Sequence, residues 1–378
     1  MKKQFLTLIL AIVFLSIYGQ TDEDLNVQEL IEKGIELYDA EEYEQSIEVF
    51  TEALEVDPTS MIATYELALS YLALNDYENA SKFSTIVINS KETKVLIGAY
   101  GIKSEALAKT NKVDKAITLL EKALKEIGDD YYLHFNLGLN YFNKGDLDKT
   151  IFHAEHALNL DKFQSGPFLL SAYTQSDQKK WVQSILSFQF FLLNEPSSSR
   201  SKVAFDEMLQ AMHIVEVKEE PVERSFIQRQ LERHTNNNNN KDKTTEKTKN
   251  IPPLDTLQGV NRELIYNAIE HTLDSLEITI DKDSITADST SSMLYVSFKE
   301  ITRALFTVLR EENDSTKKGL FWNYKVPVTT RILESPYFDT YCRYISVAYF
   351  PESLKWWEEN QEFAAKFASW LEIGDEEE

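Results

Sequence analysis

The chain has 378 residues, 43% of them hydrophobic, and a formal net charge of −23 at pH 7. This hydrophobic content is ample for a folded core, which excludes disorder along the whole chain, and the length predicts about two to three domains. So acidic a surface repels nucleic-acid phosphates and anionic lipid headgroups, so we expect neither of them as a main partner.

The first residues, MKKQFLTLILAIVFLSIYGQ, predict a signal peptide over residues 1–19. A pair of lysines forms a positive n-region, Phe5–Tyr18 forms an apolar h-region, and Gly19 precedes the expected cut. We therefore expect export to the periplasm, the cell envelope or the exterior. An uncleaved N-terminal anchor is the alternative, because Ile17 is bulky for a cleavage site. No later apolar run approaches the length of a membrane span, so none is expected after signal removal.

A unit of 34 residues then repeats along the chain, and the third copy is offset by two extra residues. Each copy has two apolar stripes at helical spacing, separated by a polar break such as DAEEY or NKGD, which predicts a pair of helices. One pair cannot bury its own apolar face, so consecutive pairs must stack into a solenoid. The copies begin at Val27, Met61, Ile97, Tyr131 and Ser165.

Small residues recur in the middle of these predicted helices. They stand where a neighbouring helix must approach closely, since glycine there has a helix-propensity cost of about 1 kcal/mol relative to alanine. The first helices have Gly34, Ala68 and Gly138, and the second helices have Ala53, Ala123 and Ala157.

This pattern resembles the tetratricopeptide repeat family, with five units over residues 27–198. The resemblance implies an all-α fold with a right-handed solenoid over residues 24–198. Ser46, Thr150 and Ser184 depart from the family, which usually has alanine in these places.

The chain after the repeats divides by composition. Residues 199–234 predict capping helices, and residues 235–252 predict a flexible linker, since TNNNNNKDKTTEKTKN contains no apolar residue. Residues 253–374 predict a second, aromatic-rich helical domain, in which NRELIYNAIEHTLDSL and YVSFKEITRALFTVLREEN have helical spacing. A polar loop separates these helices, with a short strand around Ile278 as an option.

An aromatic core is the favoured interpretation of the C-terminal domain, and an exposed aromatic platform for a ligand is the alternative. Cys342 is the only cysteine in the sequence, so no intramolecular disulfide forms, and its aromatic setting predicts a buried, unreactive thiol.

No motif for catalysis or cofactor binding stands out, since the sequence has no glycine-rich phosphate loop, no H-E-x-x-H and no G-x-S-x-G. His153 and His156 share a helix face, but Glu155 points elsewhere around the helix, which argues against a metal site. We therefore expect no catalytic residues, no cofactor and no metal, and predict that the protein is not an enzyme.

The family resemblance implies a binding surface. In this family the first helix of each unit lines a concave groove, and the matching positions here are mostly apolar and aromatic. That chemistry predicts an amphipathic helix or an apolar extended segment of another protein as the ligand. A clamp for a C-terminal carboxylate is not supported, since only Lys109, Asn136 and Asn143 hint at one. The predicted groove residues are Ile31, Ile35, Tyr38, Tyr65, Leu69, Leu72, Ile102, Lys109, Tyr132, Phe135, Asn136, Leu139, Phe142, Asn143, Leu169 and Tyr173.

The sequence thus predicts an exported adaptor, scaffold or assembly factor that binds another protein. One alternative is a self-associating structural protein whose groove is filled by its own C-terminal helices. Another alternative is a hydrolase or sugar-binding module in the C-terminal half.

Overall fold

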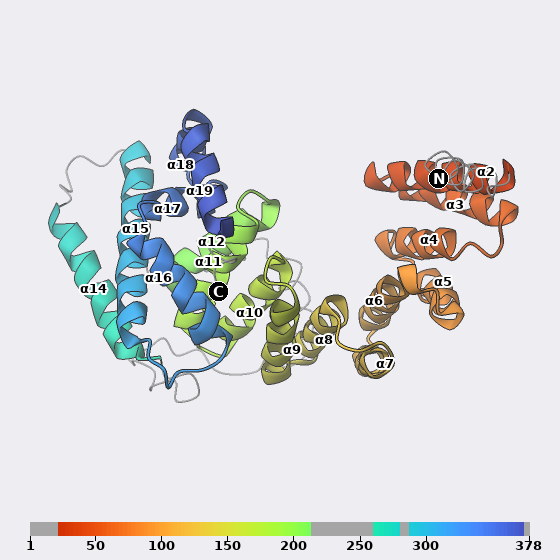
Figure 1. Cartoon of the computed structure of the whole chain (residues 1–378), viewed down its shortest axis with the longest axis horizontal. Helices are drawn as coiled ribbons and strands as arrows, with labels where there is room; N and C mark the ends of the chain where they lie inside the picture. Colours follow the sequence, from red (N-terminus) through yellow and green to blue (C-terminus); the bar gives the residue numbers. More distant parts are fainter. Residues whose placement is uncertain (1–21, 213–259, 280–286, 374–378) are drawn as a thin grey trace, which may run out of the picture. The chain divides into compact units, whose positions relative to one another are not determined.

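The computed structural model describes residues 22–212, 260–279 and 287–373 (Figure 1). Every regular element in these ranges is a helix, which confirms the predicted all-α class. The described residues fall into two compact units, unit 1 ending at Lys144 and unit 2 beginning at Gly145. The predicted signal peptide and linker lie outside the described residues, as do residues 213–234 of the predicted capping segment.

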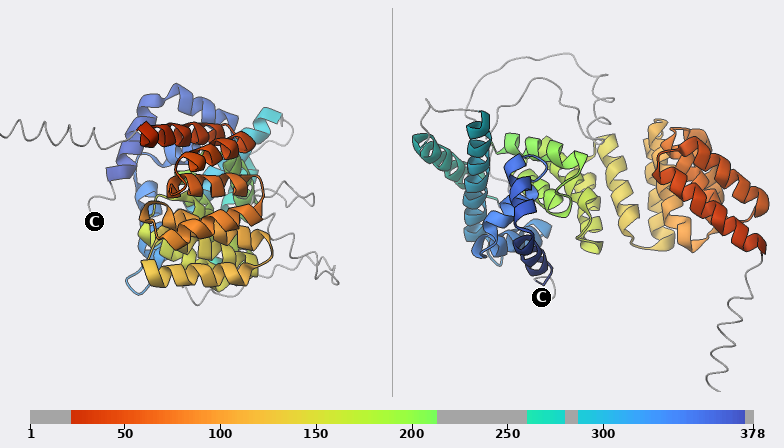
Figure 2. Two further views of the ribbon diagram at one scale, coloured as in Figure 1. Left: turned by 90° about the vertical axis from the view of Figure 1, so that its right-hand side faces the viewer. Right: turned by 90° about the horizontal axis from the view of Figure 1, so that it is seen from above.

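Unit 1 is a stack of helix pairs that follow one another in chain order (Figure 2). Each helix packs against the next, and the first helices of the pairs, α2, α4, α6 and α8, also pack side by side. The helices of this unit are α2 (Asp22–Asp39), α3 (Tyr43–Val56), α4 (Met61–Ala73), α5 (Tyr77–Ser90), α6 (Thr93–Lys109), α7 (Val113–Ile127) and α8 (Tyr131–Lys144).

The turn inside each helix pair repeats a rare backbone conformation. Glu41, Asn75, Asn111, Gly145 and Lys179 all have positive φ, between 58° and 82°, a region that L-residues other than glycine seldom adopt. The steps between them are 34, 36, 34 and 34 residues (75 − 41, 111 − 75, 145 − 111 and 179 − 145). This series confirms the five repeats and the two extra residues of the third.

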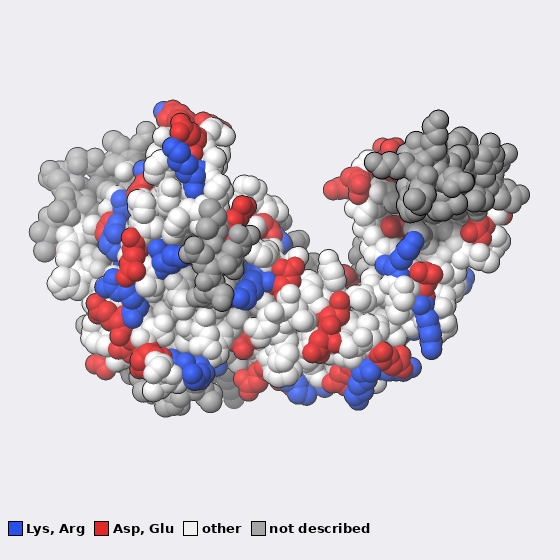
Figure 3. All heavy atoms as spheres, in the orientation of Figure 1, with Lys and Arg blue, Asp and Glu red and all other residues white. Residues whose placement is uncertain are grey.

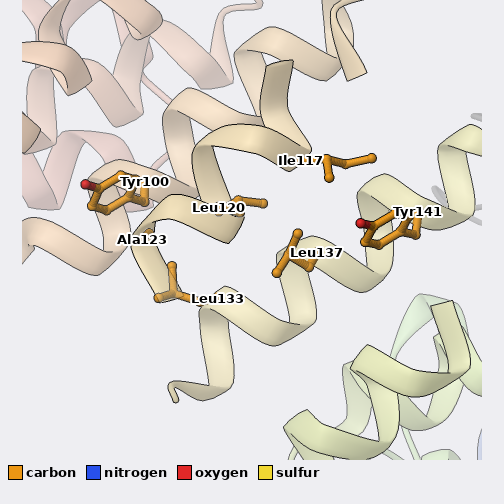
Figure 4. Close-up of a cluster of buried hydrophobic side chains, with 7 residues drawn as sticks. All are labelled: Tyr100, Ile117, Leu120, Ala123, Leu133, Leu137 and Tyr141. Atoms are coloured by element: carbon orange, nitrogen blue, oxygen red, sulfur yellow. The ribbon is translucent and has the colours of Figure 1, made fainter. Parts of the chain in front are cut away.

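Small residues let the helices of unit 1 approach closely, as the sequence predicts. A Cβ atom added to Gly34 on α2 would lie 2.4 Å from the Phe50 ring on α3. Ala53 and Ala68 are fully buried. Figure 4 shows one of the resulting core clusters, in which Leu120 of α7 and Leu137 of α8 have no solvent exposure.

Ser46 and Ser184 stand where the repeat family usually has alanine, and hydrogen bonds explain both serines. The hydroxyl of Ser46 donates to the Ser70 hydroxyl at 2.9 Å, which connects α3 to α4. The hydroxyl of Ser184 donates to the Ala172 carbonyl at 2.8 Å inside the fifth repeat. A buried hydroxyl is tolerated where it finds such a partner.

Unit 2 joins the fifth repeat to the C-terminal helices in one core. The second helix of the repeat, α11, contacts α10, α12, α17 and the π-helix η2, and its residues 182–192 are all buried. The elements of this unit are α9 (Leu147–Leu160), α10 (Ser165–Asp177), α11 (Trp181–Asn194), α12 (Ser199–Ala211), α14 (Arg262–Thr279), α15 (Ala287–Glu312), η2 (Phe321–Lys325), α16 (Val326–Glu334), α17 (Phe338–Ile345), α18 (Pro351–Glu359) and α19 (Gln361–Ile373).

Aromatic side chains form much of the core of unit 2. The Phe205 ring of α12 lies 4.9 Å from the Phe298 ring of α15 and 5.5 Å from the Phe350 ring, which precedes α18. Trp322 and Tyr341 are each 1% exposed. The preference for an aromatic core is confirmed for these residues.

Two expectations for the C-terminal half have clear outcomes. The optional strand around Ile278 is wrong, because α14 continues to Thr279; its packing against α15 overrides the local β-propensity. Cys342 is fully buried, as expected, and burial raises the pKa of its thiol.

Candidate functional site: the first-helix face of unit 1

The predicted groove residues of unit 1 lie on α2, α4, α6 and α8, and we call this surface the first-helix face. Tyr132 is the most open of them, at 57% exposure, whereas Ile31, Ile102 and Phe142 are buried. The remaining residues are half-buried: Ile35, Tyr38, Tyr65, Leu69, Leu72, Lys109, Phe135, Asn136, Leu139 and Asn143. These half-buried residues and Tyr132 present the surface, and the buried ones support it.

The predicted positions of the fifth repeat differ from this arrangement. Leu169 and Tyr173 lie on α10 in unit 2 and are 1% and 6% exposed. Tyr173 packs edge-to-face against Phe188 of α11, with ring centroids 5.4 Å apart. In this structure both side chains belong to the core of unit 2.

Two glycines on α6 shape the centre of the face. A Cβ atom on Gly98 would lie 2.7 Å from the Tyr65 ring, so the ring of Tyr65 lies directly against the α6 backbone. A Cβ atom on Gly101 would meet the side-chain amide of Asn136 on α8 at 3.6 Å. Close approach at these glycines brings side chains of three successive first helices together.

The apolar floor of the face is continuous from α4 to α6. Leu69 and Leu72 pack against a buried cluster that contains Ala68, Ile102 and Ala106. Each of these leucines keeps part of its surface open. A side chain that covers them removes apolar area from water at about 25 cal/mol per Å².

Carboxylates and phenols converge over this floor. Burial raises the pKa of Tyr38, and Tyr43, Glu66, Asp39 and Glu105 raise it further. The carboxylates among these residues come from α2, α4 and α6, so negative charge is concentrated where the first helices meet.

Burial and neighbouring groups also shift the pKa values of Tyr65 and of two carboxylates. Burial raises the pKa of Tyr65, and Glu66, Tyr38 and Tyr132 add to the shift. Burial also raises the pKa of Glu66, and the Asp39 carboxylate acts in the same direction. Burial raises the pKa of Glu105, and Lys109 partly offsets it. A cation placed here would therefore stabilise charges that the fold leaves poorly solvated.

Sequence reasoning missed Glu66, Glu105 and Gly98 as parts of this face. Glutamates in so acidic a chain look like ordinary solvated residues. A signal was nevertheless present, because Glu66 precedes Leu69 by three residues and thus shares its side of α4.

In the parts of the chain that the structure describes, no group of three His, Cys, Asp or Glu side chains is arranged to hold an ion. The Nδ1 atom of His156 lies 2.8 Å from the Phe152 carbonyl oxygen.

Within the described ranges, no helix is both long and apolar enough to cross a membrane.

Stacked helix pairs with a recurrent turn define an α-solenoid repeat protein. Family models described as tetratricopeptide repeat match residues 31–87 and 131–164. The N-terminal half of the chain is therefore a tetratricopeptide-repeat array, and such repeats place it among protein–protein interaction proteins.

Each individual relative matches about half of this chain or less. A TPR repeat-containing protein of Methanocaldococcus jannaschii is 24% identical over 126 residues, which cover 33% of this chain and 22% of that protein. A thermophilic TPR protein of Thermus thermophilus is 21% identical, covering 48% of this chain and 98% of its own, with a TM-score of 0.44. PilF of Pseudomonas aeruginosa is 17% identical, covering 51% of this chain and 87% of its own, with a TM-score of 0.43.

Proposed function

We propose that this protein is an exported, non-enzymatic adaptor or scaffold that binds a segment of another protein on the first-helix face of unit 1. The observation that carries the proposal is the packing of Tyr65 with Leu69 and Leu72 against the α6 backbone on a floor that stays partly open, with Glu66 and Tyr38 close enough to raise the pKa of Tyr65. Aromatic side chains that keep one face open are the usual anchors of protein interfaces.

The chemistry of the face describes the segment that fits it. Leu69, Leu72 and Phe135 favour an apolar stripe, such as one side of an amphipathic helix. Glu66, which the Asp39 carboxylate also affects, and Glu105 favour Lys or Arg beside that stripe, since a cation compensates their loss of hydration. The expected partner segment is therefore amphipathic and basic.

Site-specific photo-cross-linking in cells tests this proposal. A photoreactive amino acid replaces the exposed Tyr132 on the face, and in a matched variant it replaces Ile86 on α5, which is 42% exposed. We expect a discrete cross-linked protein from position 132 and none from position 86. Glu66→Gln in the first variant should weaken that product several-fold, because a charge-assisted hydrogen bond is roughly twice as strong as a neutral one.

Three results would contradict the binding proposal. They are equal cross-linking from both positions, no product from position 132, and a product that Glu66→Gln leaves unchanged. A product consisting of two copies of this chain would instead support the self-associating alternative.

Export has its own test. The N-terminal sequence of the protein recovered from the native cell envelope or medium is expected to begin at Gln20. An intact N-terminus in a protein that stays in the cytoplasm would contradict export and leave the binding proposal standing.

A further inference from the structure

Two adjoining cavities lie in unit 2. The larger measures about 620 Å³ and lies between the turn after α9 and the helices η2 and α16. The smaller measures about 240 Å³ and is enclosed by α11, α16, α17, α18 and α19. Phe163, Tyr324, Val328 and Arg331 line both, so they form the junction between the two. The larger cavity falls within the range of about 300–1,000 Å³ that is usual for ligand sites.

The smaller cavity is apolar and aromatic. Its walls include Phe190, Tyr344, Trp357, Phe367 and Leu371. The ring of Tyr344 is held in place by contacts with Trp357 at 4.9 Å and with Phe367 at 5.8 Å between centroids. Such a preformed space suits one large apolar side chain, which enters it with little reorganisation.

The larger cavity is polar by comparison and opens beside exposed apolar side chains. Asn159 and Asn323 contribute amide groups that can both donate to and accept from a peptide backbone. At its edge Phe163 is 68% exposed and Leu160 is 49% exposed. A hydrogen bond holds the turn that contains Phe163, because the backbone N–H of Phe163 donates to the Asp161 carboxylate at 2.9 Å. An ordered, open phenylalanine beside a cavity is typical of an interaction site.

Two cations are held at the junction and the edge by aromatic rings. The guanidinium of Arg331 lies 4.8 Å from the centre of the Trp370 ring and donates to the Leu371 carbonyl at 3.2 Å. The ammonium of Lys162 lies 4.6 Å from the centre of the Tyr324 ring. Arg331 has five N–H groups, so this hydrogen bond leaves donors for a ligand. The rings fix both cations in position without neutralising them.

Two acids, Asp161 and Glu372, also line the cavities, and in the described part of the chain neither forms an ion pair with Arg331 or Lys162. The Asp161 carboxylate accepts from the Phe163 N–H and from the Gln164 side-chain amide. Glu372 is exposed and lines only the smaller cavity. Lys and Arg side chains elsewhere on the visible face of unit 2 are interspersed with Asp and Glu (Figure 3). Selection of an acidic ligand therefore depends on these two individually placed cations.

We propose that the joined cavities bind an internal peptide segment of another protein in which a large apolar side chain is followed by Asp or Glu. The apolar side chain fills the smaller cavity, and the carboxylate pairs with Arg331 at the junction and with Lys162. The peptide then continues through the larger cavity, where Asn159 and Asn323 bond its backbone. Asn159 and Asn323 line the larger cavity and not the smaller one, so there are groups to bind backbone on both sides of the carboxylate, which favours a chain that continues over one that ends there. This site is independent of the first-helix face.

Fluorescence anisotropy with the full chain and three labelled peptides tests the proposal. The probe is acetyl-Ser-Trp-Asp-Glu-Gly-Ser-amide; the controls replace Asp-Glu by Asn-Gln, or Trp by Ala. We expect the probe to bind and each control to bind at least about tenfold more weakly, which corresponds to 1.4 kcal/mol. Arg331→Gln and Lys162→Gln should weaken the probe by a similar factor, and Val328→Trp should abolish binding by filling the junction.

Arg303→Gln is the matched control variant. Arg303 also stacks on a ring, with its guanidinium 4.2 Å from the centre of Phe338, but it lines neither cavity. It should bind the probe as the parent does. Lys162 is exposed, so its replacement keeps the test valid if Arg331→Gln fails to fold by circular dichroism.

Several results would overturn the proposal. The first is equal affinity for the acidic and neutral peptides, and the second is no binding of any peptide. A third is an Arg303→Gln loss as large as that of Arg331→Gln. A chain shortened to end at Ile373 that binds tenfold more tightly would show that the chain's own acidic end occupies the site. Self-association that Val328→Trp abolishes would show that a second copy does.

Discussion

Inside unit 2, the ammonium group of Lys325 donates a 2.6 Å hydrogen bond to the hydroxyl of Ser187. This bond connects the π-helix η2 to the central helix α11. Lys325 is 3% exposed, and burial lowers the pKa of its ammonium to about 8, although the Glu155 carboxylate acts in the opposite direction. The hydrogen bond has a specific geometry, but burying the ammonium group removes its hydration and costs free energy.

The lowered pKa of Lys325 predicts an unusual pH dependence. The unfolded chain keeps the ordinary lysine pKa of 10.5, so between about pH 8 and 10.5 it binds more protons than the folded chain. The free energy of unfolding should therefore rise with pH above about 8, and the burial of the charge should lower stability at neutral pH by about 3 kcal/mol. Above about pH 10, tyrosines such as Tyr341, whose pKa burial raises, act in the opposite direction.

Urea unfolding at pH 7, 8, 9 and 10, followed by tryptophan fluorescence, checks this expectation. All 5 tryptophans lie in unit 2, so the signal reports that unit. Lys325→Met should flatten the rise, whereas Lys202→Met, at an exposed lysine of α12, should preserve it. A rise that survives in Lys325→Met would show that another group causes it.

A pair of glycines in unit 1 should respond to alanine in opposite directions. In Gly34→Ala the new methyl group would meet the Phe50 ring at 2.4 Å, so we expect a net loss of roughly 1–3 kcal/mol of stability. In Gly101→Ala the nearest atom is at 3.6 Å, so the helix-propensity gain of up to about 1 kcal/mol remains. Hydrogen exchange should become faster in α2 and α3 for the first and slower in α6 for the second; the same direction in both would refute the packing explanation.

The hydroxyls of Ser46 and Ser70 should be energetically coupled. Both side chains are fully buried. The Ser70 hydroxyl, which accepts from Ser46, in turn donates to the Glu66 carbonyl at 2.9 Å. Each serine-to-alanine change should cost about 1 kcal/mol, and the double variant should cost less than their sum by about 0.5–1 kcal/mol. Denaturant unfolding followed by far-UV circular dichroism measures the cycle. Thr51→Ala combined with Ser46→Ala provides the additive control, since exposed Thr51 bonds only its own helix.

Cys342 should react with thiol reagents only when unit 2 opens. Its burial excludes reagents and raises the pKa of the thiol, so raising the pH to 9 should speed the reaction far less than it does for an ordinary thiol. Alkylation rates of the native chain, compared with those in denaturant, measure this. Lys202→Cys in a Cys342→Ala background supplies an exposed thiol on the same unit for comparison. Equal native rates for the two positions would contradict the buried assignment.

The repeat architecture was predictable because the same small residues and polar breaks recur at matching positions of successive repeats. Small residues such as Ala53 and Ala68 mark close helix contacts wherever they recur, and recurrence distinguishes them from chance. The positive φ at Asn75 likewise follows from a polar break that the sequence repeats. The assignment of Tyr65 and Leu69 to one face came from the resemblance to the repeat family, which places these first-helix positions in its groove, and the structure leaves both side chains half-buried on α4.

Burial by distant segments was not predictable in this way. Leu169 and Tyr173 have the spacing of surface residues in a repeat, yet they lie in the core of unit 2. Lys325 looks like any lysine in an aromatic stretch, and nothing near it in the chain indicates that it will meet Ser187. Such contacts depend on how long segments fold back on one another, and hydrophobic periodicity carries no information about that.

The burial of α11 on all sides limits how such a chain can grow by duplication. A helix pair inserted between α5 and α6 would pack against α5 on one side and α6 on the other, and both of these helices already pack against neighbouring helix pairs. A pair copied after α11 would displace α12, α17 and η2 from the helix on which they pack. We therefore expect natural length variants of this protein to gain or lose repeats upstream of α10, with the fifth repeat retained as a fixed adaptor to the C-terminal helices.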